Sequence, residues 1–91
     1  MKILASNQEL YDWLVKLASQ LASRNASDLG DLLLRASRTS VGNMSTEFLG
    51  ESRIAVRRVL AKEYGKLTNQ ERVEMQDVLQ QLDNALERRT F

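Results

Sequence analysis

Residues 6–21 read SNQELYDWLVKLASQL, and residues 68–86 follow the same plan as TNQERVEMQDVLQQLDNAL. Behind each opening tetrapeptide, apolar residues recur at spacings of four, three and four: Leu10, Leu14, Leu17 and Leu21 in the first stretch, and Met75, Leu79, Leu82 and Leu86 in the second. This spacing places the apolar side chains on one face of a helix. Both stretches therefore predict amphipathic helices that pack against other helices at the shallow crossing angles common in bundles.

The two tetrapeptides, Ser6–Glu9 and Thr68–Glu71, have the pattern of capping boxes at helix N-termini. In such a box the hydroxyl accepts a hydrogen bond from the backbone N–H three residues later, and the glutamate accepts one from the N–H of the hydroxyl residue. The glutamate also lies near the positive end of the helix dipole. We interpret the repeated motif as a helix start and not as a binding motif.

Two more helices are predicted between these stretches. Ser27 is expected to cap the first of them, over residues 28–39, and the second is expected over residues 46–64. Gly50 leaves the start of the second open between Ser45 and Gly50, because glycine costs about 1 kcal/mol in a helix interior relative to alanine. Gly65 follows this helix and suits the left-handed position after a helix end.

These patterns together predict an all-α protein. We expect a single small domain over residues 1–91, with helices at about 7–24, 28–39, 46–64 and 69–88. Short connections between four helices favour a four-helix antiparallel bundle or an orthogonal helical array. No segment alternates apolar and polar residues over a length that would predict a strand.

The composition argues against an enzyme. The chain of 91 residues has no histidine and no cysteine, so it lacks the commonest general base, the thiolate nucleophile and the usual zinc ligands. Two carboxylate pairs, Asp28 with Asp31 and Glu47 with Glu51, have spacings that suit Mg²⁺ or acid–base chemistry. Such pairs are also common on solvated helix N-termini, and we expect no catalysis, no metal and no cofactor.

The hydropathy pattern predicts a cytoplasmic protein. The apolar run at residues 3–5 is too short for a signal peptide, and the leucines at 32–34 are far from the roughly 20 residues of a membrane span. The absence of cysteine fits a reducing compartment. We therefore expect no membrane partner.

The net charge of +1 conceals an uneven distribution. Seven bases and three acids lie between residues 35 and 66, which gives this part of the chain a charge of +4. Four of these bases form two adjacent rows, at helical spacing, on one side of the helix predicted at 46–64: Arg53, Arg57, Arg58 and Lys62. Arginine-rich faces bind phosphates or acidic protein surfaces, although no aromatic residue here offers a stacking platform for single strands.

Three apolar residues exceed what the predicted core needs, namely Trp13, Val15 and Ile54. Surplus apolar surface on a small helical domain is typical of an interface with a partner or with a second copy of the chain, although a four-helix core could also absorb it. We therefore predict a non-enzymatic interaction or regulatory module that contacts an unidentified protein partner and forms a homo-oligomer. Binding of nucleic acid through the basic face of the helix at 46–64 is the alternative.

Overall fold

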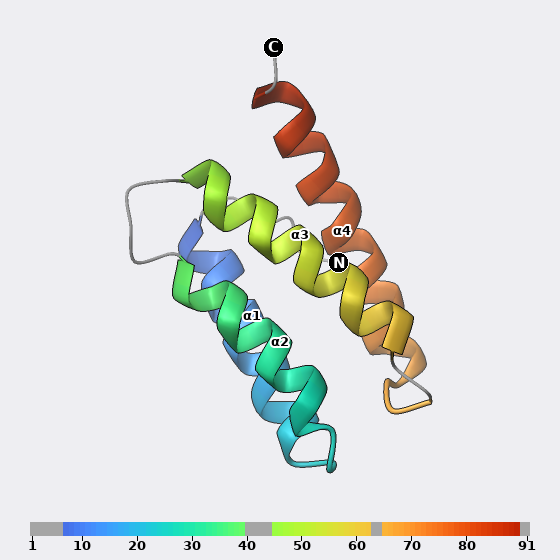
Figure 1. Cartoon of the computed structure of the whole chain (residues 1–91). Helices are drawn as coiled ribbons and strands as arrows, with labels where there is room; N and C mark the ends of the chain where they lie inside the picture. Colours follow the sequence, from blue (N-terminus) through green and yellow to red (C-terminus); the bar gives the residue numbers. More distant parts are fainter. Residues whose placement is uncertain (1–6, 40–44, 63–64, 90–91) are drawn as a thin grey trace.

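The computed structural model describes residues 7–39, 45–62 and 65–89 (Figure 1). It contains four helices: α1 (Asn7–Ala22), α2 (Ser27–Arg38), α3 (Ser45–Lys62) and α4 (Asn69–Arg89). The all-α prediction is confirmed. α3 begins at Ser45, the earliest of the starts that the sequence left open, and Gly50 is therefore inside the helix.

The chain folds as two helical hairpins that pack on each other. α1 and α2 run antiparallel side by side, as do α3 and α4 (Figure 1). α3 also packs on α2 and so joins the two pairs. Helices that follow one another along the chain pack directly, α1 on α2, α2 on α3 and α3 on α4. In the described part of the chain, α1 and α4 have little direct packing, and side chains join them.

The turn between α1 and α2 fits one prediction and corrects another. Asn25 has a left-handed φ of 61°, and the Ala26 N–H donates to the Leu21 carbonyl at 2.9 Å, which closes a Schellman motif. α1 ends at Ala22, within two residues of the predicted end at about 24. Ser27 does not cap α2, because the N-cap is Ala26, which has no side-chain oxygen. Ala26 is fully buried and belongs to the hydrophobic core.

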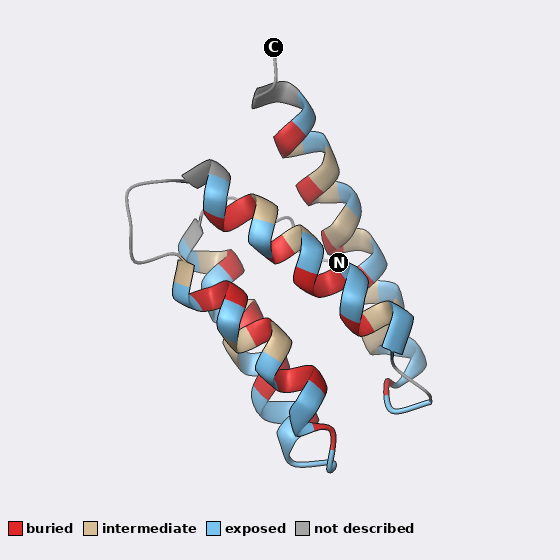
Figure 2. Ribbon diagram, viewed as in Figure 1, coloured by how far each residue is buried: buried red, intermediate tan, exposed pale blue. Residues whose placement is uncertain are grey.

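The core receives side chains from every helix, and buried positions recur along one side of each (Figure 2). The predicted stripe of α1 is entirely buried, and in α4 only Leu79 is half-buried. In α3 the core also takes Phe48 and Leu49. The largest fully buried apolar side chains are Leu14, Leu21, Leu29, Leu33, Phe48, Val56, Val59, Met75 and Val78.

One close contact sets the spacing of the first hairpin. Gly30 of α2 is buried, and a Cβ placed on it would lie 2.8 Å from the backbone oxygen of Ala18 in α1. The two helices therefore approach to backbone contact at this point, which glycine alone permits.

A second contact ties the two hairpin ends together. Lys66, in the segment between α3 and α4, donates to the Asn25 carbonyl at 3.5 Å and lies 3.9 Å from Asp28 of α2. Next to it, Gly65 has a φ of +78°, as its predicted place after α3 requires. No described helix is long and apolar enough to cross a membrane.

Candidate functional site

The structure separates the four basic residues predicted from the sequence into two groups. Arg53 and Arg57 turn toward α4, where their guanidinium groups lie 3.6 Å and 3.3 Å from Asp83 Oδ1. One carboxylate thus offsets part of the charge of both arginines, and the Nε of Arg53 is buried without a hydrogen-bond partner. Arg53 and Arg57 therefore do not present two free cations to solvent.

Arg58 projects about 100° farther around α3 than Arg57, toward α2. There it lines a groove of about 110 Å³ with Ile54 and Ala55 of its own helix. Arg35 of α2 stands across from it, and Glu51 lies one turn before Ile54 along α3. We call this surface the α2–α3 face and define it by Leu32, Arg35, Ala36, Glu51, Ile54, Ala55 and Arg58.

The α2–α3 face combines exposed charge with exposed apolar surface. The side chain of Ile54 is 42 % exposed, and Leu32 is half-buried beside it. Two arginines and one glutamate border the groove, which leaves it a net positive charge. Lys62, exposed one turn after Arg58, extends the positive side along α3.

The three predicted apolar interface residues do not form one patch. Ile54 lies in the α2–α3 face, whereas Trp13 is half-buried, packs against the core and donates its indole N–H to Glu74 of α4. Val15 is half-buried and lines neither this groove nor the cleft described next. Among these three, only Ile54 leaves a large apolar side chain exposed.

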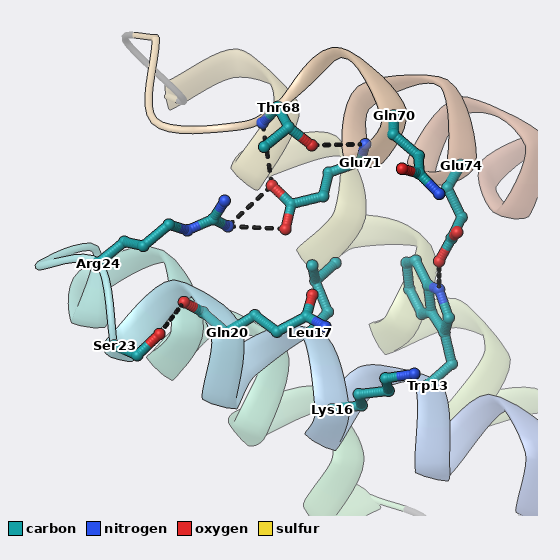
Figure 3. A pocket seen from close by; sticks show the side chains of 10 residues that line it. All are labelled: Trp13, Lys16, Leu17, Gln20, Ser23, Arg24, Thr68, Gln70, Glu71 and Glu74. Atoms are coloured by element: carbon teal, nitrogen blue, oxygen red, sulfur yellow. Dashed lines mark hydrogen bonds and ion pairs between the residues drawn. The ribbon is translucent and has the colours of Figure 1, made fainter.

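A cleft of about 450 Å³ separates α1 from the start of α4 (Figure 3). Lys16, Leu17 and Gln20 line it from α1, and Gln70 and Glu74 line it from α4. Two side-chain bridges cross it, one at either end. Trp13 with Glu74 forms the first, and the hydrogen bonds from Arg24 to both carboxylate oxygens of Glu71, at 2.8 Å and 2.7 Å, form the second.

Glu71 has two structural roles in this cleft. Its backbone N–H donates to Thr68 Oγ1 at 3.1 Å and its carboxylate accepts from the Thr68 N–H at 2.9 Å, so the predicted capping box at α4 is present. Partial burial by itself would raise the pKa of the Glu71 carboxyl, but the hydrogen bonds from Thr68 and the ion pair with Arg24 outweigh it, and the pKa is lowered. The equivalent box at α1 begins at Ser6, outside the described residues.

The carboxylate pairs considered in the sequence do not assemble into a larger group. Among residues 7–39, 45–62 and 65–89, no three acidic side chains cluster as metal ligands. The glycine- and hydroxyl-containing connection before α3 lies largely outside the described residues, apart from Thr39, whose hydroxyl donates to the Ala36 carbonyl at 2.6 Å.

The α1–α4 cleft was not predicted from the sequence. Its two bridges join residues that are far apart in the sequence: Arg24 and Glu71 are separated by 47 positions. Trp13 and Glu74 are separated by 61 positions, and no local spacing marks such pairs. The capping motif did single out Glu71, but it gave no indication that the same carboxylate would bind Arg24. The groove of the α2–α3 face was predicted only in part, through Arg58 and Ile54.

Comparisons of the chain with protein-family models, with curated proteins and with solved structures find no match. The geometry of the two surfaces is therefore the basis for the proposals that follow.

Proposed function

We propose that this protein is a non-enzymatic interaction module that binds an acidic segment of a partner protein on its α2–α3 face. The observation that carries the proposal is Ile54, 42 % exposed in a groove bordered by Arg35 and Arg58. A scattered exposed isoleucine is ordinary on a protein surface. An exposed isoleucine inside a groove with a basic rim has the composition of a binding surface, in which a small apolar centre is surrounded by charge.

The charge of the rim selects the partner. Two guanidinium groups bind carboxylates through charge and through the fork geometry of their N–H donors. A partner helix with an apolar residue flanked by aspartates or glutamates would fill the groove and pair with the arginines. Electrostatic complementarity of this kind contributes mainly to specificity and to the rate of association.

Nucleic acid is the weaker candidate on the same residues. A phosphate backbone requires a row of free cations, and Asp83 pairs with Arg53 and Arg57 on the α4 side of the helix. Aromatic stacking partners are also missing from the α2–α3 face. Location in the cytoplasm and self-association remain predictions from the sequence.

The test is capture of binding partners by the immobilised protein from a lysate of its own organism, with and without nuclease. Ile54→Asn removes the apolar centre of the groove. Val73→Asn is its matched control, because Val73 is also an exposed apolar residue, 65 % exposed on α4, outside both the groove and the cleft. We expect a protein that is retained after nuclease, lost with Ile54→Asn and kept with Val73→Asn. Retention that disappears with nuclease would contradict the proposal and support nucleic-acid binding.

A further inference from the structure

The cleft between α1 and α4 has the dimensions of a small-molecule site. Its volume of about 450 Å³ falls within the range of about 300–1,000 Å³ that ligand pockets occupy. The Trp13–Glu74 bridge closes one end and the Arg24–Glu71 bridge closes the other (Figure 3). None of the residues that line the cleft lines the α2–α3 groove, so an inference about the cleft does not depend on the proposed function.

The two walls carry opposite charges. The α1 side contributes Lys16 and Arg24, whereas the α4 side contributes Glu71 and Glu74. Arg24 and Glu71 neutralise each other at 2.7 Å. What remains is one ammonium group on the α1 side and one carboxylate on the α4 side.

These two remaining charges are available to a ligand. Within the described residues, the side-chain ammonium group of Lys16 has no hydrogen-bond or ion-pair partner. The carboxylate of Glu74 uses only Oε1, which accepts a hydrogen bond from the Trp13 indole N–H. The side-chain amides of Gln20 and Gln70 also line the cleft, one from each wall, and supply further donors and acceptors.

Apolar surface lies between the two charged walls. Leu17 is buried and lines the cleft, and the half-buried indole of Trp13 stands beside it (Figure 3). The indole N–H is bound to Glu74, which fixes the ring and favours its use as a surface for an aromatic group.

We propose that the α1–α4 cleft binds a small zwitterion with an aromatic side chain, that is, an aromatic α-amino acid. Its carboxylate pairs with Lys16 and its ammonium group with Glu74, while its ring packs against Trp13 and Leu17. A ligand that carries a single charge satisfies only one wall and leaves the opposite charge unpaired.

The experiment uses the intrinsic fluorescence of Trp13, the single tryptophan of the chain, during titration with L-phenylalanine. Two analogues separate the charges: 3-phenylpropionate lacks the ammonium group and phenethylamine lacks the carboxylate. We expect a saturable change in Trp13 fluorescence with L-phenylalanine. Each analogue should bind about tenfold more weakly, because it lacks one charge-assisted hydrogen bond. Equilibrium dialysis with labelled L-phenylalanine provides a measurement that is independent of the fluorescence.

Two variants assign the charges. Lys16→Gln should weaken L-phenylalanine and 3-phenylpropionate about tenfold and leave phenethylamine unchanged. Glu74→Gln should weaken L-phenylalanine and phenethylamine about tenfold and leave 3-phenylpropionate unchanged. The amide oxygen of the glutamine can still accept the hydrogen bond from the indole. Lys62→Gln is the matched control, since Lys62 is an exposed lysine outside the cleft.

Several results would overturn the proposal: no saturable binding in both measurements, equal affinities for the zwitterion and its analogues, or equal effects of Lys16→Gln and Lys62→Gln.

Discussion

Replacement of Gly30 by alanine should destabilise the protein, although alanine is the better helix former. The new Cβ would lie 2.8 Å from the Ala18 backbone oxygen, 3.5 Å from its carbonyl carbon and 3.6 Å from its Cα. A backbone neighbour cannot rotate away as a side chain can, so α1 and α2 must separate. Overpacking of a core costs about 1–3 kcal/mol, and backbone displacement places this site near the upper value.

The helix propensity of alanine offsets about 1 kcal/mol of that cost, which leaves a net loss of about 2 kcal/mol. Gly50→Ala is the matched control within the same chain, because nothing lies within 4 Å of a Cβ at that position of α3. Gly50→Ala should therefore stabilise the protein by about 1 kcal/mol.

The assay is urea unfolding followed by far-ultraviolet circular dichroism, with thermal unfolding as a second measure. For a domain of this size, a loss of about 2 kcal/mol lowers Tm by roughly 8–16 °C. If Gly30→Ala were as stable as the parent while Gly50→Ala gained stability, the close approach of α1 and α2 would be wrong.

Further predictions concern the capping box and the ion pairs. Thr68→Ala should lower the free energy of unfolding by about 1 kcal/mol in urea titrations, and a loss below the error of the assay would contradict the capping bond to Glu71. Because the folded-state pKa of Glu71 is lowered, the stability it contributes is complete above its ordinary pKa of 4.5 and is lost as the pH falls through the folded value. The stability difference between the parent and Glu71→Gln should therefore shrink on acidification below that pH, and a constant difference would contradict the lowered pKa that the Thr68 N–H and Arg24 produce. Asp83→Asn should cost less than about 1 kcal/mol, since its ion pairs are largely exposed, yet it should raise the salt concentration that elutes the protein from heparin because Arg53 and Arg57 lose their counter-charge. Unchanged elution would mean that Asp83 does not neutralise them.

The helices could be predicted because their signals are local. The leucine spacing after Asn7 and the capping residues Thr68 and Glu71 each lie within one or two helical turns, and the structure has helices at both places. The α2 start was placed one residue late because hydroxyl residues are good caps in general. In this protein Ala26 takes the position instead, where it is buried in the core and makes no side-chain cap bond.

The candidate sites were harder to predict because they depend on pairs that are remote in the sequence. Spacing alone placed Arg53, Arg57 and Arg58 on one basic side of α3. Only the position of α4 shows that Asp83 binds two of them and leaves Arg58 against α2. The α1–α4 cleft likewise exists because Trp13 and Arg24 reach across to a helix that begins more than 40 residues later.

The most direct test of the proposed function compares Arg57→Ala with Arg58→Ala, because Arg57 pairs with Asp83 of α4 whereas Arg58 lines the α2–α3 groove. The measurement is the dissociation constant of each variant for the partner protein that is retained after nuclease. We expect Arg58→Ala to weaken binding about tenfold, because it removes a charged contact from the rim of the groove, and Arg57→Ala to leave binding within about twofold of the parent. Equal losses in the two variants would contradict a specific α2–α3 face and would indicate that the basic side of α3 acts through its overall charge.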